Sequence, residues 1–307
     1  MNALSVIFFG TSEFAVPSLK ALQEDERFIV KAIVTQPDRP VGRKQETRKS
    51  AVKLAAESFG IQILQFDSVK TPETVEILKD FNADTFVVAS FGQIIPQTVL
   101  DIPKHGSINV HGSILPKYRG ASPVAGAITA GEKETGVTIM LMDAKMDHGP
   151  VLTIAKEEIR NDDTTETLSL RLAKLGAEIL PETIWNYVND DLKPEKQNHD
   201  EASFVKILSR ESGRIDWHKT AEEIERMVRA FAPWPGTFFE LDGKRVKILK
   251  AGMGPETQKE PGTRFIHEGM PVVACGSGSS LFLKEAQMEG KRAMNGSDFL
   301  RGNKYWM

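Results

Sequence analysis

Short apolar runs alternate with longer amphipathic stretches through the first 188 residues of the chain. Apolar runs of this kind are typical of parallel strands covered on both faces by helices, so the pattern predicts an open, mostly parallel α/β sheet. We expect strands at 6–9, 30–35, 61–64, 85–89, 107–110, 136–142 and 151–157, and helices at 14–23, 52–59, 71–81, 123–130 and 165–188.

The last third of the chain has a different pattern. Residues 189–200 are polar and lack apolar periodicity, which predicts a solvated linker, placed at 189–205, between domains at 1–188 and 206–307. After a short helix at 220–229, alternating strands at 236–241, 245–251, 271–274 and 280–285 are separated by Gly-rich turns. We expect these strands to form a small OB-like β-barrel. Such a domain could bind an oligonucleotide, or it could have a purely structural role.

Composition places the chain among globular proteins, with 40% hydrophobic and 26% charged residues and no apolar run long enough for a membrane span. The first residues lack a basic segment and a cleavage site, and the single cysteine, Cys275, excludes an internal disulfide. We therefore expect a cytoplasmic protein.

Charge is divided unevenly although the net charge is only −3. Residues 206–307 hold 17 Lys and Arg against 13 Asp and Glu, whereas the rest of the chain holds 22 against 29. The C-terminal part is therefore the half that we expect to meet a polyanion.

Nucleotide motifs give little support for a bound nucleotide. The turn from Gly10 to Phe14 could hold an anion at a helix start, or Ser12 could simply cap that helix. No G-x-G-x-x-G and no G-x-x-x-x-G-K-[ST] is present, which disfavours a dinucleotide and a nucleoside triphosphate.

A candidate site follows from the strand at 107–110. Side chains two positions apart in a strand share a face, so Asn109 and His111 point to the same side, at the carboxyl edge where open α/β sheets bind ligands. An amide and a protonated imidazole both donate hydrogen bonds to the oxyanion of a tetrahedral intermediate. A serine hydrolase is excluded because no G-x-S-x-G is present.

Asp147 is the expected third member of this site. Its loop follows the strand at 136–142, and we expect that loop to emerge at the same sheet edge as Asn109 and His111. A carboxylate beside an imidazole favours the charged ring. His148 competes by sequence but, as the neighbour of Asp147, should face elsewhere. Each residue taken alone also has an explanation without catalysis: Asn109 could form a turn, His111 could be a surface imidazole, and Asp147 could cap a loop. The scattered histidines and the absence of H-E-x-x-H argue against a metal site.

The segment from Asn109 to Gly120, together with Asp147, resembles the formyltransferase superfamily, which uses 10-formyltetrahydrofolate. The resemblance implies a Rossmann-like enzyme domain in which Asn109, His111 and Asp147 are catalytic and no metal cofactor is used. Further matching segments extend it over nearly the whole chain and favour the methionyl-tRNA branch: 9–11, 35–43, 91–96, 134–140, 214–217, 233–235, 287–294 and 298–302. The residues implied to contact the folate are Ser113, Ile114, Leu115 and Pro116.

The basic segment 38–53 is either a solvated loop or, by the resemblance, the element that contacts the acceptor end of initiator methionyl-tRNA. Arg39, Arg43 and Lys44 would then contact phosphates. A formyltransferase for an amino sugar or a purine precursor and a catalytically silent RNA-binding relative remain alternatives, although the basic segment and the positive C-terminal part favour tRNA. We expect a monomer, since no heptad repeat is evident.

Overall fold

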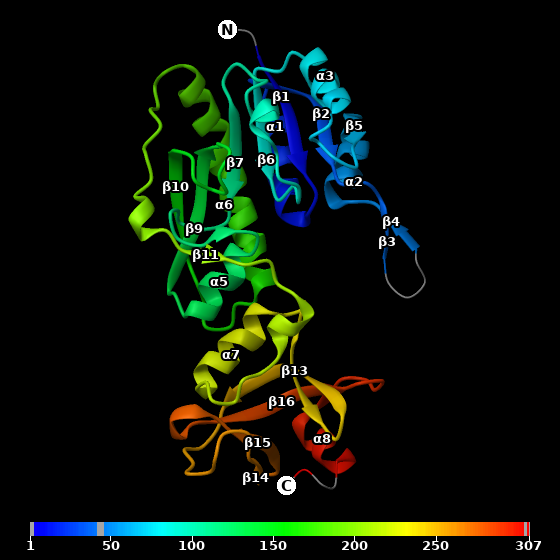
Figure 1. Ribbon diagram of the computed structural model, residues 1–307, viewed down its shortest axis with the longest axis vertical. Helices are drawn as coiled ribbons and strands as arrows, with labels where there is room; N and C mark the ends of the chain where they lie inside the picture. The colour runs from blue at the N-terminus through cyan, green and yellow to red at the C-terminus, as the bar shows by residue number, and fades with distance from the viewer. Residues whose placement is uncertain (1–2, 42–45, 304–305, 307) are drawn as a thin grey trace. The chain divides into compact units, whose positions relative to one another are not determined.

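The chain forms two compact units in the computed structural model, which describes residues 3–41, 46–303 and 306 (Figure 1). The first unit comprises Met1–Pro123, Glu134–Glu158 and Ser169–Val205. The second comprises Val124–Lys133, Ile159–Leu168 and Lys206–Met307, so both units are discontinuous along the sequence.

A seven-stranded sheet in the order β10-β9-β7-β6-β1-β2-β5 forms the centre of the first unit. All seven expected strands are present, and the five from β7 to β5 run parallel, which confirms the mostly parallel sheet. In contrast, β9 is antiparallel to both β7 and β10. The bounds are β1 Leu4–Gly10, β2 Phe28–Thr35, β5 Gln62–Gln65, β6 Thr85–Ala89, β7 Ser107–His111, β9 Glu134–Leu141 and β10 Val151–Glu158.

Helices follow the strands of this unit largely as expected. Ser50 caps α2 by accepting a hydrogen bond from the Lys53 amide, and Gly60 ends that helix in the left-handed conformation. Ser12 does not cap a helix and donates instead to Ser90 Oγ at 2.7 Å. The patterns do not predict the short α4. The bounds are η1 Glu13–Ala15, α1 Val16–Glu24, α2 Ala51–Phe59, α3 Pro72–Asp80, α4 Gln97–Leu100 and α6 Thr165–Val188.

Close packing of α6 covers one face of β7. A Cβ atom at Gly176 of α6 would lie 2.9 Å from Val110 Cγ1 and 3.3 Å from Val137 Cγ1, so only glycine allows this approach. Because side chains alternate along a strand, Asn109 and His111 point to the opposite face. The helix packing thus fixes which face of β7 carries polar groups.

A hairpin of β3 Arg39–Val41 and β4 Glu46–Arg48, which the patterns do not predict, extends away from the sheet next to α2 (Figure 1). At its base Lys53 Nζ pairs with Asp38 Oδ2 at 2.6 Å, and Gln65 Nε2 donates to Asp38 Oδ1 at 2.8 Å. These hydrogen bonds lower the pKa of the Asp38 carboxyl. The start of the hairpin is therefore anchored to the sheet.

The second unit is built on an antiparallel sheet in the order β12-β13-β16-β15-β14, with β17 beside β16. Pairing within the described residues does not join β12 to β14, so the structure has an antiparallel sheet where we expected an OB-like barrel. The bounds are β12 Thr237–Leu241, β13 Lys244–Met253, β14 Arg264–His267, β15 Met270–Ala274, β16 Ser280–Met288 and β17 Met294–Asn295, with helices α5 Pro123–Ala130, α7 Ala221–Ala230 and α8 Gly296–Gly302.

Helix α7 organises this second unit. Thr220 and Glu223 form a capping box at its start, and Ile224 and Val228 enter the apolar core. On its other face Arg226 Nε donates to the Thr129 carbonyl at 3.2 Å, and Arg229 Nη1 donates to the carbonyl of residue 163 at 2.9 Å. These bonds connect 124–133 and 159–168 to α7, which explains why both belong to the second unit rather than to a continuous domain at 1–188.

Candidate active site

The carboxyl end of β7 carries two buried polar side chains. Asn109 is 9% exposed and His111 is 6% exposed, and both lie on the face opposite α6. Burial of polar groups without partners is costly, so groups placed this way are expected to bind either protein atoms or a ligand.

Asp147 reaches these side chains by a different route from the one expected. Because β9 is antiparallel to β7, the loop after β9 begins at the amino end of β7, where the Met142 amide donates to the Ser107 carbonyl at 2.8 Å. The loop then folds back along the sheet face, and Asp147 adopts the left-handed conformation with φ 49°. The prediction that the Asp147 loop emerges at the carboxyl edge of β7 is therefore wrong, although Asp147 does come close to Asn109 and His111.

One carboxylate oxygen is shared between the two donors. Asp147 Oδ1 lies 3.5 Å from Asn109 Nδ2 and 3.6 Å from His111 Nδ1. The other oxygen, Oδ2, accepts from the Gly120 amide at 2.7 Å. His111 Nε2 lies 3.1 Å from the Tyr118 carbonyl, which can only accept, so Nε2 carries a hydrogen and Nδ1 faces the carboxylate. Both distances are long for hydrogen bonds, so Asn109 Nδ2 can also donate to another oxygen, and His111 Nδ1 can do so when the ring carries a second hydrogen.

A strap formed by residues 197–205 holds the loop after β7. The Arg119 amide donates to the Ser203 carbonyl at 2.8 Å, and β8 Arg119–Gly120 pairs in parallel with β11 Phe204–Val205. Gly120 has φ 112°, and a Cβ atom there would lie 2.4 Å from the Val205 carbonyl oxygen. Only glycine fits this position. Residues 189–205, which composition predicts as a linker, therefore belong to the first unit.

Two residues near Asp147 escape sequence reasoning. Gln197 is buried and donates to the Asp147 carbonyl at 2.9 Å, while its own carbonyl accepts from Arg119 Nη2 at 2.6 Å. Arg119 stands within the segment that carries the family resemblance, but Gln197 lies in a polar stretch without any motif. No signal in a single sequence marks Gln197.

His148 faces away from His111, as its position beside Asp147 suggests. Its Nδ1 lies 2.6 Å from Asp143 Oδ2, and its ring stacks on that of His199 at 3.9 Å. Desolvation, followed by the charges of His148 and Arg119, lowers the pKa of His199. The partners of His148 are thus Asp143 and His199 rather than His111.

The expected folate loop is internally braced. Ser113 is fully buried and donates to the carbonyl of residue 117 at 2.7 Å, and the Leu115 amide donates to Thr138 Oγ1 at 3.1 Å. The Leu115–Pro116 peptide is cis. The side chains of Ser113 and Leu115 are buried. Those of Ile114 and Pro116 are half-buried and are therefore the ones in this loop that a ligand could contact.

Of the expected tRNA contacts, Arg39 is exposed at the start of β3. Arg43 and Lys44 lie outside the described residues. Throughout the described chain, the His, Cys, Asp and Glu side chains form no group of three that could hold a metal ion. None of the described helices combines the length and the apolar character needed to cross a membrane.

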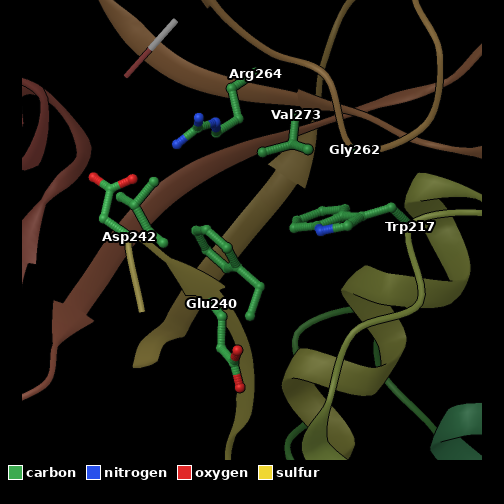
Figure 2. A pocket seen from close by; sticks show the side chains of 8 residues that line it. Trp217, Glu240, Asp242, Gly262, Arg264 and Val273 are labelled. Atoms are coloured by element: carbon green, nitrogen blue, oxygen red, sulfur yellow. The ribbon is translucent and has the colours of Figure 1, made fainter. Parts of the chain in front are cut away.

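Two surface hollows lie away from Asn109 and His111. One, of about 250 Å³ in the second unit, has Trp217, Asp242 and Arg264 on different sides of its rim (Figure 2). The other, of about 660 Å³, borders Ala83 and Asp84, at the amino end of β6 and hence opposite the carboxyl edge. Neither hollow contains a residue of the candidate site.

Comparison with known proteins decides the family. A model of the formyl transferase family matches residues 3–184, and a model of the formyl transferase C-terminal domain matches residues 207–304. Methionyl-tRNA formyltransferases from Geobacter metallireducens and Caldanaerobacter subterraneus subsp. tengcongensis are 42% and 44% identical over 302 residues. These alignments cover 98% of this chain and 96% and 97% of the relatives. This chain belongs to the methionyl-tRNA formyltransferase family. The resemblance noted in the sequence is thereby confirmed.

Solved structures agree with this formyltransferase fold. WlaRD, a sugar 3N-formyl transferase determined in the presence of dTDP and 5-N-formyl-THF, matches with a TM-score of 0.66 at 22% identity, over 95% of this chain and 100% of that chain. HypX from Aquifex aeolicus in complex with tetrahydrofolic acid matches with a TM-score of 0.61 at 18% identity, over 98% of this chain and 47% of that chain.

Proposed function

We propose that this formyltransferase moves the formyl group of 10-formyltetrahydrofolate to the free amine of initiator methionyl-tRNA, giving formylmethionyl-tRNA for translation initiation. The full-length relatives support this acceptor over an amino sugar or a purine precursor. The observation that carries the chemistry is the shared Asp147 oxygen, 3.5 Å from Asn109 Nδ2 and 3.6 Å from His111 Nδ1.

Each of the three side chains has a distinct part in the proposed mechanism. The folate supplies an electrophilic formyl carbon bonded to N10. Asn109 Nδ2 and Nδ1 of the protonated His111 ring donate to the formyl oxygen as negative charge develops there, while the Tyr118 carbonyl accepts from Nε2 and holds the ring. Asp147 accepts the proton that the methionyl amine loses as the new C–N bond forms, and this proton leaves on N10 as the old bond breaks.

Binding roles complete the proposal. Ile114 and Pro116 in the loop 113–116 would contact the folate, and Arg39, Arg43 and Lys44 would contact tRNA phosphates. We further infer that the second unit is the OB-like tRNA-binding domain, and that the protein is a cytoplasmic monomer.

Formylation of methionyl-tRNA tests this function. Wild-type protein incubated with 10-formyltetrahydrofolate should convert methionyl-tRNA to formylmethionyl-tRNA on acid gels. Asn109→Ala and His111→Ala should each lower kcat by about a hundredfold or more, because a lost oxyanion donor typically raises the barrier by about 3–4 kcal/mol. His105→Ala, a change of a half-buried histidine at the opposite, amino edge of the same sheet, is the matched control and should keep full activity. Formylation of an amino sugar but not of methionyl-tRNA by the wild type would contradict the acceptor.

A further inference from the structure

Gln197 is a buried amide that bridges three groups of the first unit. It is 7% exposed, and its Nε2 donates to two carbonyls, that of Asp147 at 2.9 Å and that of Gly149 at 2.7 Å. Its Oε1 accepts from Arg119 Nη2 at 2.6 Å. One side chain therefore holds the backbone on both sides of His148.

The conformation that Gln197 holds is one that the loop would not adopt freely. Asp147 has φ 49°, a left-handed backbone conformation that residues other than glycine adopt only with strain. Release of the two carbonyls would let this residue relax. Its carboxylate would then move relative to Asn109 and His111.

Arg119 fixes the orientation of the Gln197 amide. It is 3% exposed, and its Nη2 also contacts His199 Nδ1 at 2.8 Å. A flipped amide would point its NH2 group at the Arg119 donor and its oxygen at the two loop carbonyls, which leaves only repulsive contacts. The next residue, Gly120, donates its amide to Asp147 Oδ2. Strand β8 thus holds Asp147 twice, through Gly120 and through the Arg119–Gln197 pair.

We propose that Gln197, oriented by Arg119, is a positioning residue for formyl transfer that sets the distance from the Asp147 carboxylate to the donors Asn109 and His111. This inference rests on the proposed function, because it requires Asp147 to act in the reaction. A displacement of about 1 Å in such a site lowers turnover by about a hundredfold.

The decisive variant is Gln197→Glu, which keeps the shape and the acceptor for Arg119 but removes both donors to the loop. We expect kcat to fall by about 10- to 100-fold while KM for folate and for tRNA stays within about twofold. The pH profile of kcat should also shift, because the Asp147–His111 distance changes. Gln197→Met, which removes the donors without burying a charge, should behave alike, and circular dichroism confirms folding of both variants.

Asn189→Asp is the matched control, since it also loses an amide donor to a carbonyl, that of Trp185 at 2.8 Å. It should leave kcat and the pH profile unchanged. An equal fall in kcat in this control and in the Gln197 variants would show a general loss of structure and overturn the positioning role.

A double-mutant cycle with Asp147→Asn separates this inference from the proposed function. If Gln197 acts through Asp147, then Gln197→Met should cost nothing further in the Asp147→Asn background. Failure of the wild type to formylate methionyl-tRNA would refute the proposed function itself. Full activity of Asp147→Asn would leave that function intact but would show that Asp147 does not act in the reaction, which overturns the positioning role as well. A slow Asp147→Asn together with a fully active Gln197→Met, or with additive losses, would leave the function intact and overturn the positioning role.

Discussion

Residues that are adjacent in the sequence can have different roles because the tertiary structure gives them different contacts. Asp147 lies near the side-chain nitrogens of Asn109 and His111, whereas the adjacent His148 stacks on His199 and pairs with the half-buried Asp143. Strand alternation predicts that Asn109 and His111 share a face, because this depends only on local geometry. No local rule predicts the stacking of His148, since its partner lies far along the chain.

Cys275 should be chemically silent in the native protein. It is 1% exposed in the apolar core of the second unit, and burial raises the pKa of its thiol to about 12. The thiolate is the reactive form, so Ellman's reagent at pH 8 should leave the native protein unlabelled. In guanidinium chloride, the thiol of the unfolded protein should react at once with one equivalent of the reagent. Rapid labelling of the native protein at pH 8 would contradict this burial.

The helices and strands of the chain differ in how far local sequence determines them. The helices at 123–130 and 165–188 are found at the expected residues, as α5 and α6, because their apolar periodicity and flanking turns are local signals. The direction of β9 is not local. A parallel and an antiparallel neighbour of β7 bury the same apolar residues, so only the assembled sheet shows that β9 runs antiparallel.

Arg27 joins the start of β2 to α6, and this link makes stability depend on pH. Its guanidinium bonds to Asp25 at 2.7 Å and to Glu182 at 2.8 Å, and it lies 5.5 Å from the Trp185 ring. The hydrogen bond from Arg27 lowers the pKa of Asp25. A carboxyl with a lowered native pKa stabilises the fold above its unfolded value of about 3.9 and loses this contribution as pH falls through the native value.

Asp25→Asn should therefore lower the free energy of unfolding at pH 7 by about 1 kcal/mol or less, since the pair is partly exposed. The difference from wild type should shrink as pH falls below about 4 and vanish below the native pKa. Urea unfolding across this pH range checks both points. Glu26→Gln, a change at the exposed adjacent carboxylate, is the control and should have no pH-dependent effect. A difference that persists unchanged at pH 2 would contradict the ion pair.

The whole molecule combines a slightly negative net charge of −3 with a positive C-terminal third and a basic segment at 38–53. Such a distribution favours contact with a polyanion through a few basic regions rather than through a uniformly basic surface. The described strands of the hairpin extend away from the sheet, and Arg39 at its start is exposed (Figure 1).

Removal of the charges of Arg39, Arg43 and Lys44 together should weaken binding of methionyl-tRNA. Each lost phosphate contact should also reduce the slope of log K against log salt by about 0.7–0.9. Filter binding at several salt concentrations measures both quantities, and folate affinity should not change. The control replaces Lys20, Lys70 and Lys79, which removes the same charge from other exposed positions of the first unit. Equal effects in the two triple variants would argue against a specific hairpin contact.

Local patterns in the sequence by themselves determined the mostly parallel sheet, most helices, and the pairing of Asn109 with His111 on one face. Apolar periodicity and strand alternation act over a few residues, so they can be read without the fold. The tertiary structure alone decided that residues 197–205 strap the loop after β7, that Asp147 arrives by folding back from an antiparallel strand, and that Gln197 holds it. These features depend on hydrogen bonds between residues about 30 to 85 positions apart, which no local pattern records.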